Sequence, residues 1–184
     1  MTIASPKLDP SKINIKPLVN KNCISNFSCG VNEIDNWANR KARSLHIKGR
    51  KRVFIAWHED CATSLGFYSL SFSLENSSKL KEQADRQAWS KGAPLIYMDY
   101  IGVTTKRQGT GLGTLMLIDA LKRTQSVSDN VAIFGIALRS LNSKTTTLYK
   151  NSGFGIAEGE GDYPLMIMPI WTIVDLFSQD KHPV

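Results

Sequence analysis

A short glycine-rich segment carries the clearest chemical signal in the sequence. It reads Gln108-Gly109-Thr110-Gly111-Leu112-Gly113 and lies between an apolar stretch, 95–103, and a stretch with helical spacing, 112–123. The first N–H groups of a helix have no partner within the helix, and the helix dipole adds partial positive charge there. Glycines let a phosphate approach the backbone closely, so the segment predicts an anion-binding turn.

The spacing of these glycines excludes two common phosphate-binding motifs. A P-loop requires GxxxxGK[ST], and neither Lys-Ser nor Lys-Thr follows Gly113. A dinucleotide-binding fold requires GxGxxG, whereas this chain has GxGxG. From the residues alone a plain alternative stays open, in which the glycines only let the helix pack against the preceding strand.

Basic residues are concentrated ahead of the glycine segment. The chain has 23 Lys and Arg against 16 Asp and Glu, which gives a formal net charge of +7. Seven of these cations form a run without any acid: Arg40, Lys41, Arg43, Lys48, Arg50, Lys51 and Arg52. Such a run usually forms a solvated helix face, although the basicity of the whole chain favours a polyanionic partner.

The spacing of apolar residues predicts the elements that position these groups. Strands are expected at 13–18, 52–57, 64–74, 95–103, 131–138 and 163–171. Helices are expected at 31–49, 79–90, 112–123 and around 145–153. This order predicts a mixed α/β sheet covered by helices, in one domain over residues 1–184 with residues 1–12 loose.

Composition excludes several other classes of protein. With 42% hydrophobic and 21% charged residues the chain is not a disordered polymer, and no apolar run reaches the roughly 18 residues of a membrane helix. The first residues lack the pattern of a secretory signal. Cys23, Cys29 and Cys61 have no CxxC spacing, so we expect neither a disulfide framework nor a metal site. This use of cysteine favours a cytoplasmic location.

Three features in the expected order resemble the GNAT N-acetyltransferase superfamily. Gln108, Gly111 and Gly113 match its [QR]xxGx[GA] signature at a helix start. The strand end Tyr100-Ile101-Gly102-Val103 is similar to the family's Leu-Ala-Val, with Gly in place of Ala, and Asn142, Tyr149 and Gly153-Phe154 have the spacing of its Asn…Tyr-x-x-x-Gly-Phe element. The resemblance implies a GNAT fold: a central, mixed, mostly antiparallel twisted sheet of six to seven strands, flanked by about four helices.

Nearly the whole chain resembles the GNAT toxins of bacterial toxin–antitoxin pairs. The similar segments are Phe27-Ser28-Cys29-Gly30, Ile34-Asp35-x-Trp37, Gly66-Phe67-Tyr68-Ser69-Leu70 and Met166-Ile167-Met168-Pro169-Ile170. The resemblance implies a toxin that acetylates the α-amine of aminoacyl-tRNA by direct transfer in a ternary complex and so blocks translation. It also implies a homodimer and a ribbon-helix-helix antitoxin, with no membrane partner. The alternative is an acetyltransferase of a small amine or a protein amine without a toxin role.

The resemblance also implies the substrate-binding residues. Acetyl-CoA would be the co-substrate, without a metal, held by the strand end and the helix start: Ile101, Gly102, Val103, Gln108, Gly109, Thr110, Gly111, Leu112, Gly113, Thr114 and Asn142. The RNA would lie against the basic run and one further lysine: Arg40, Lys41, Arg43, Lys48, Arg50, Lys51, Arg52 and Lys91. Such contacts predict a steep dependence of binding on salt, because each neutralised phosphate releases counterions.

Two side chains are candidates for proton transfer. Taken alone, Tyr149 is best interpreted as a core tyrosine, but its family spacing implies a general acid that donates to the leaving thiolate. Asp99 is a candidate general base, and a paired structural carboxylate is an equally good interpretation. An α-amine with a pKa of about 7.7–8.0 is already partly neutral, so the toxin function does not require a base. His46 and His58 are interpreted as surface residues.

Overall fold

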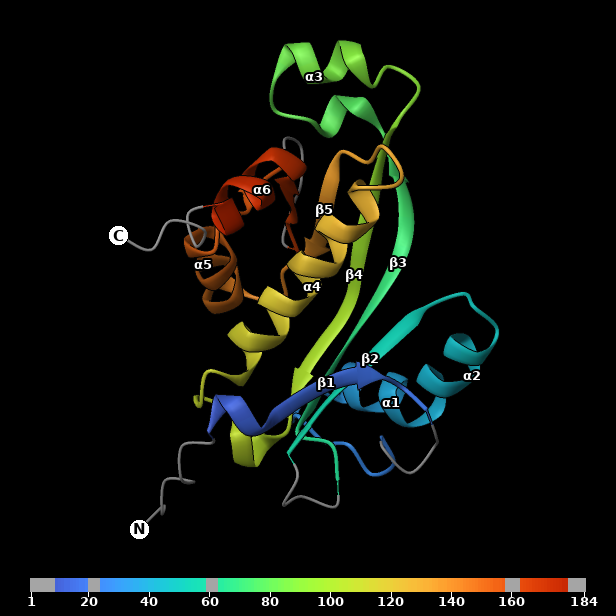
Figure 1. The fold of residues 1–184 in the computed structure, drawn as a ribbon, viewed down its shortest axis with the longest axis vertical. Coiled ribbons are helices and arrows are strands. Elements are labelled where there is room, and N and C mark those ends of the chain that lie inside the picture. The colour runs from blue at the N-terminus through green and yellow to red at the C-terminus, as the bar shows by residue number, and fades with distance from the viewer. Residues whose placement is uncertain (1–8, 20–23, 59–62, 158–162, 179–184) are drawn as a thin grey trace. The chain divides into compact units, whose positions relative to one another are not determined.

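The computed structural model describes residues 9–19, 24–58, 63–157 and 163–178 (Figure 1). Its first half contains η1 (Pro10–Lys12), β1 (Ile13–Pro17), α1 (Asn32–Arg40), α2 (Ala42–Ile47), β2 (Arg52–His58), β3 (Gly66–Glu75), η3 (Ser77–Lys79) and α3 (Gln83–Ala88). Its second half contains β4 (Ala93–Val103), η4 (Thr105–Arg107), α4 (Leu112–Ser128), β5 (Gly135–Arg139), α5 (Ser143–Asn151), β6 (Gly155–Ile156), β7 (Leu165–Pro169) and α6 (Ile170–Ser178).

The strands form one sheet in the order β1-β2-β3-β4-β5-β7-β6. Strands β4 and β5 run parallel, whereas β1 with β2, β2 with β3, β5 with β7 and β6 with β7 pair antiparallel. This confirms the predicted mixed, mostly antiparallel sheet of six to seven strands. Six α-helices, rather than about four, are present in the part of the chain that the structure describes.

Contacts along the chain divide the protein into two compact units. Unit 1 comprises Met1–Ser71 and Asp99–Ala120, and unit 2 comprises Phe72–Met98 and Leu121–Val184. One domain over 1–184 therefore stays a prediction. Most of the start that was expected to be loose, residues 1–8, lies outside the described ranges.

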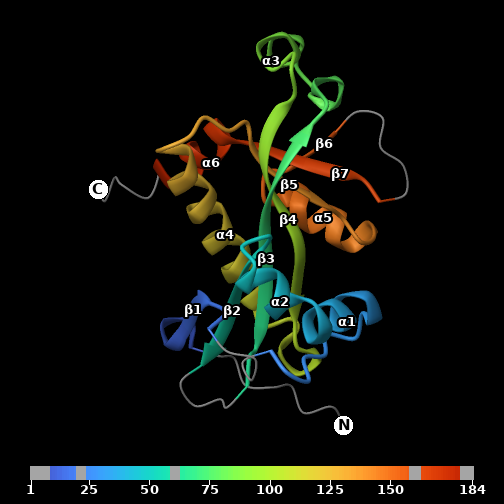
Figure 2. The same ribbon diagram turned by 90° about the vertical axis from the view of Figure 1, so that its right-hand side faces the viewer.

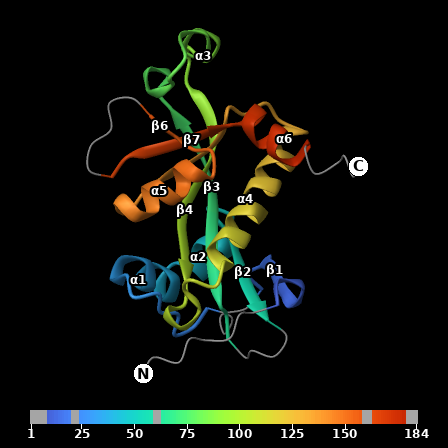
Figure 3. The same ribbon diagram turned by 90° about the vertical axis from the view of Figure 1, so that its left-hand side faces the viewer.

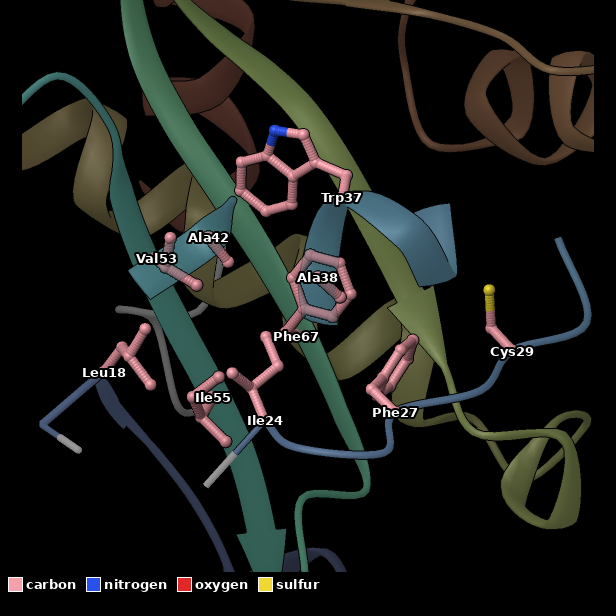
Figure 4. Close-up of a cluster of buried hydrophobic side chains, with 10 residues drawn as sticks. All are labelled: Leu18, Ile24, Phe27, Cys29, Trp37, Ala38, Ala42, Val53, Ile55 and Phe67. Atoms are coloured by element: carbon pink, nitrogen blue, oxygen red, sulfur yellow. The ribbon is translucent and has the colours of Figure 1, made fainter. Parts of the chain in front are cut away.

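The core of unit 1 lies between the strands β2 and β3 and the helices α1 and α2, which lie together in Figure 2. Trp37 and Ala38 of α1 and Ala42 of α2 are turned toward Val53 and Phe67 of the strands (Figure 4). The Trp37 ring stacks on Phe67 with 5.8 Å between ring centroids, and on Tyr100 of β4 with 4.6 Å. Burial of large aromatic groups is a main source of core stability.

The core of unit 2 is built on β4, β5 and β7 with the segment around η3. Phe134 is buried at its centre, and its ring meets Trp89 and Trp171 edge to face at 6.4 and 5.4 Å. Strand β7 continues directly into α6 (Figure 3). None of the described helices is both long and apolar enough to cross a membrane.

Two helical regions differ from the sequence prediction. The single helix expected at 31–49 is divided at Lys41 into α1 and α2. The Asn39 amide donates to the carbonyls of Asp35 and Phe27, at 2.8 and 2.9 Å, and so ties the end of α1 to the loop before it. Helix α6 was not predicted, because its residues Ile170-Trp171-Thr172-Ile173-Val174 are of types that favour strands.

Candidate functional site

The glycine turn lies where the sequence predicted it, between the end of β4 and the start of α4. Gly109 and Gly111 have φ angles of 74° and 86°, in the left-handed region that other residues avoid. A Cβ built at either position would meet no atom within 4 Å, so the space beside the turn is open. Such a turn is suited to a bound anion, because its backbone can be approached closely.

The Gln108 side chain fixes the shape of this turn. Its Nε2 donates to the Cys29 carbonyl at 2.8 Å and to the Val103 carbonyl at 3.2 Å. The Thr110 hydroxyl donates to the Arg107 carbonyl at 2.7 Å. The turn is thereby joined both to the end of β4 and to the loop that precedes α1.

Helix α4 begins directly after the turn, and its first N–H groups have no hydrogen-bond partner among the residues that the structure describes. Its first backbone bond runs from Leu115 N–H to the Gly111 carbonyl at 3.1 Å. The N–H groups of Leu112, Gly113 and Thr114 belong to the first turn, where a helix offers them no partner. They are available to an anion.

The end of β4 is closely packed around Gly102, the position at which the family has alanine. A Cβ at Gly102 would lie 3.1 Å from the Phe27 ring and 3.2 Å from Ile34. A Cβ at Gly66 would lie 2.9 Å from the Gly102 carbonyl oxygen. A Cβ at Gly102 would therefore be tight, and the Phe27 and Ile34 side chains would have to shift by a few tenths of an ångström to admit it.

Asp99 is paired within unit 1. Its carboxylate accepts from Lys51 Nζ and, at 2.9 Å, from Ser71 Oγ, and Lys51 Nζ also donates to Ser71 Oγ at 3.0 Å. These contacts match the interpretation of Asp99 as a paired structural carboxylate. The participation of Ser71 was not predicted, because a lone serine in a strand gives no signal in the sequence.

Tyr149 and Asn142 belong to unit 2, whereas the glycine turn belongs to unit 1. Tyr149 is 6% exposed on α5, and burial raises the pKa of its hydroxyl to about 12. Among the described residues none forms a hydrogen bond with this hydroxyl, and the ring meets Phe154 at 5.7 Å. Asn142 is the N-cap of α5, where its side chain accepts from Thr145 N–H at 3.0 Å.

The basic run follows the surface of unit 1. Its members lie on α1, at the junction between α1 and α2, on α2, in the turn after α2 and at the start of β2. All are exposed except Lys51, which is half-buried in its pair with Asp99. Lys91 is exposed in unit 2. The RNA-binding role of these residues stays a prediction.

The two histidines differ from the surface interpretation. His58 is only 6% exposed, so the interpretation is wrong for this residue. His46 Nδ1 accepts from Val53 N–H at 3.0 Å, and burial, together with the charge of Arg52, lowers its pKa.

A buried thiol near the turn was not predicted to matter. Burial, assisted by a hydrogen bond to Asp35, raises the pKa of Cys29 to about 11. Burial alone would raise the pKa of Asp35, but hydrogen bonds from Cys29 N–H at 2.7 Å and Ser28 Oγ at 3.2 Å outweigh it and the pKa is lowered. Within the described ranges no group of three or more His, Cys, Asp or Glu residues is placed to hold a metal ion.

No protein-family model matches the chain. Over 174 residues it is 29% identical to the probable toxin TacT of Sinorhizobium fredii, covering 89% of this chain and 94% of that protein. Over 145 residues it is 23% identical to the tRNA-acetylating toxin of Mycobacterium tuberculosis, covering 79% and 86%.

Solved structures of toxins share the fold. A KacT variant superimposes with a TM-score of 0.83 at 21% identity, covering 90% of this chain and 99% of KacT. AtaT in complex with acetyl-methionyl-tRNAfMet gives 0.80 at 23% identity, with the same coverage. An AtaT variant bound to acetyl-CoA and to the C-terminus of the antitoxin AtaR gives 0.74 at 23% identity, covering 91% and 99%. The chain has the fold of the KacT and AtaT toxins, and the resemblance to the GNAT toxins that its motifs indicated is confirmed.

Proposed function

We propose that the protein is an acetyl-CoA-dependent N-acetyltransferase that acts as a toxin by acetylating the α-amine of aminoacyl-tRNA. The observation that carries this proposal is the open glycine turn at the start of α4, joined by Gln108 to the end of β4. The named activities of the similar toxins support it, since one acetylates tRNA and another is known with acetylated methionyl-tRNA.

The chain's own residues fit the two ends of acetyl-CoA. The pyrophosphate would bind the N–H groups from Gln108 to Thr114, where the partial positive charge of the helix start favours an anion. The pantetheine arm would lie along the β4 end, Ile101–Val103, in the manner of an added strand. The Val103 N–H would donate to the acetyl oxygen, a type of contact that contributes about 2.7–4 kcal/mol in other acyl-transfer enzymes.

Tyr149 would serve the leaving group. With its pKa raised to about 12 the phenol stays protonated at neutral pH, so it can donate to a thiolate. Its hydroxyl forms no hydrogen bond with any described residue. Full transfer of its proton is uphill, because a thiol has a pKa of about 8.5, so a hydrogen bond to the developing charge is the favoured role.

Cys29 is poorly suited to form an acetylated-enzyme intermediate, in keeping with the proposed direct transfer. A thiol attacks as its thiolate, and the pKa of about 11 keeps Cys29 protonated at neutral pH. It is also 6% exposed. An acceptor amine that attacks the thioester directly needs no such nucleophile, and an α-amine is partly neutral without help from a base.

The proposed partners follow from charge and from the similar toxins. Exposed cations between Arg40 and Arg52, with Lys91 in unit 2, would contact tRNA phosphates. AtaT is known with its antitoxin AtaR, and we propose a ribbon-helix-helix antitoxin for this chain as well. We also propose a homodimer and a cytoplasmic location.

The test is incubation of the purified protein with radiolabelled acetyl-CoA and bulk charged tRNA. Wild-type protein should label the tRNA fraction, and Tyr149→Phe should not. Tyr163→Phe is the matched control, since Tyr163 is an exposed tyrosine of the same unit and should leave labelling intact.

A separate measurement distinguishes the alternative function. If acetyl-CoA binds by calorimetry but no tRNA is labelled, the proposed substrate is wrong and a small-amine or protein acetyltransferase takes its place. Expression of wild-type protein should also halt growth, and expression of Tyr149→Phe should not.

A further inference from the structure

Three polar side chains, Lys51, Ser71 and Asp99, form a half-buried group in unit 1, called here the polar cluster. Asp99 lies on β4, just before the strand end that the proposed function assigns to acetyl-CoA. Each member contacts the other two: Lys51 Nζ donates to Asp99 and to Ser71, and Ser71 Oγ donates to Asp99 Oδ2 at 2.9 Å. The side chains of Lys51 and Asp99 are 27% and 13% exposed, so the pair is largely withdrawn from water.

The polar cluster coincides with a break in the alternation of β4. Successive side chains of a strand normally point to opposite faces of the sheet. Tyr100 stacks on Trp37, which also stacks on Phe67, so Tyr100 and Phe67 face the same side of the sheet. Ser71 follows Phe67 by four residues on β3, and this even spacing places its side chain on that side too. Asp99 bonds Ser71, so the consecutive residues Asp99 and Tyr100 face the same side, as they do at a β-bulge.

The bulge directly precedes the residues that matter for acetyl-CoA. Ile101–Val103 complete β4, and the Val103 carbonyl then accepts from Gln108 of the glycine turn at 3.2 Å. A bulge bends its strand and redirects the residues that follow. Asp99, which the contacts of the polar cluster hold, lies just before this segment of β4.

We propose that the polar cluster is a positioning element that holds the β4 bulge and so aligns Ile101–Val103 with the pantetheine arm of acetyl-CoA. This rests on the proposed function for the location of that arm. It replaces two earlier assignments, Asp99 as a general base and Lys51 as an RNA contact. Both Asp99 oxygens already accept hydrogen bonds, and the Lys51 ammonium is directed at Asp99 and Ser71 rather than at solvent.

The test compares Asp99→Asn, Ser71→Ala and Lys51→Met with the control Asp129→Asn, which alters an exposed aspartate of unit 2. Acetyl-CoA affinity is measured by calorimetry without tRNA, and kcat and both KM values are measured by tRNA acetylation. We expect Asp99→Asn and Lys51→Met to raise the Kd and KM for acetyl-CoA about tenfold, and Ser71→Ala about threefold, because misplacement of a binding edge weakens the complex. The KM for tRNA, the pH profile of kcat and the control should stay as in the wild type.

Three results would overturn the proposal. A loss of kcat of about 100-fold or more in Asp99→Asn, with an altered pH profile and unchanged acetyl-CoA affinity, would identify Asp99 as a base. A raised KM for tRNA in Lys51→Met, with a salt slope reduced by about one and normal acetyl-CoA affinity, would identify Lys51 as a phosphate contact. Wild-type values in all three variants would remove any role for the cluster.

Rescue separates positioning from loss of folding. The double variant Lys51→Asp/Asp99→Lys exchanges the two charges. It should bind acetyl-CoA more tightly than Lys51→Asp alone or Asp99→Lys alone, and equally weak binding in all three would count against the proposal. If Asp99→Asn fails to fold, Ser71→Ala decides, since it removes one hydroxyl and leaves the ion pair. Because acetyl-CoA binding is measured without tRNA, a protein that binds acetyl-CoA but leaves tRNA unlabelled would contradict the proposed substrate and not this inference.

Discussion

Two buried tyrosines, one in each unit, differ in the hydrogen bonding of their hydroxyl groups. Tyr68 of unit 1 has no exposed surface, and its hydroxyl donates to the Asp119 carboxylate of α4. Tyr149 of unit 2 is almost as buried, yet its hydroxyl forms no hydrogen bond with any described residue. Buried polar groups are paired in most proteins, because an unpaired one lowers stability.

The two environments predict different roles for the two hydroxyls. The hydroxyl of Tyr68 fastens α4, the helix whose first turn carries the glycine segment, to β3. The hydroxyl of Tyr149 forms no comparable hydrogen bond with a described residue, which fits the contact with the leaving group proposed above. A paired tyrosine should therefore matter for folding and an unpaired one for the reaction.

The largest expected effect is on the reaction. Tyr149→Phe should lower the rate of tRNA acetylation about 100-fold or more, as expected for loss of a general acid or of an equivalent donor. Its free energy of unfolding should stay within about 0.5 kcal/mol of the wild type, because no hydrogen bond within the described protein is removed. Rapid-quench assays and denaturant titration measure the two quantities. Normal acetylation in this variant would contradict the comparison.

Glycines of the two units offer a second contrast. A Cβ at Gly135 would lie 2.1 Å from the Met168 carbonyl, so Gly135→Ala should cost about 3 kcal/mol by disrupting the pairing of β5 with β7. Gly111→Ala meets no atom but places alanine at φ 86°, which should cost about 1–2 kcal/mol and weaken acetyl-CoA binding. Chemical denaturation measures the free energy of unfolding of both variants. Equal losses of stability would contradict the distinction between the steric contact at Gly135 and the backbone conformation at Gly111.

Alkaline titration tests the burial of Tyr149 directly. Its pKa is about 12 in the folded protein and about 10 when unfolded, so between pH 10 and pH 12 the unfolded state alone loses the proton. Stability should therefore fall by about 2 kcal/mol as the pH rises through this window. Tyr149→Phe should lack this component, seen as a smaller loss of stability over the same pH range. Identical alkaline profiles for the two proteins would contradict it.

Tyr68→Phe is the counterpart in unit 1. It leaves the Asp119 carboxylate without one donor, so the free energy of unfolding should fall by about 1–2 kcal/mol. Acetylation under conditions where the variant is folded should be retained. Lost stability in Tyr149→Phe and none in Tyr68→Phe would reverse the assignment of the two roles.

The smallest expected effect is at Cys29. Because the thiol is buried and protonated at neutral pH, Cys29→Ala should acetylate tRNA within about twofold of the wild type. No acetylated cysteine should be found by mass spectrometry of protein incubated with acetyl-CoA alone. An acetyl group on Cys29 would contradict direct transfer.

Much of this arrangement could be predicted from local pattern. Strand alternation and helical spacing located β1 to β4, and the glycine spacing located the turn, since these signals lie in neighbouring residues. The strand expected at 131–138 was located only in part, because β5 begins at Gly135. Contacts between distant segments gave no such signal. Gly102 is crowded by Phe27, which is 75 residues away in the sequence, and Asp99 is paired with Lys51, which is 48 residues away.

The basic run shows a further limit of sequence reasoning. Seven cations were treated as one surface, because spacing along the chain cannot tell which of them has an acidic neighbour in space. The structure separates Lys51 from the others by its pair with Asp99. Helix α6 was missed because its first residues are β-branched and aromatic types, which prefer strands locally.

The stacking of Trp37 between Phe67 and Tyr100 gives the protein a built-in optical probe. Tyr100 adjoins Ile101, so any shift of the β4 end changes the environment of the indole. A variant that keeps Trp37 and replaces the other three tryptophans with phenylalanine would report such shifts as changes in fluorescence. Stopped-flow emission would then time the movement of this strand as a ligand arrives, independently of any acetylation.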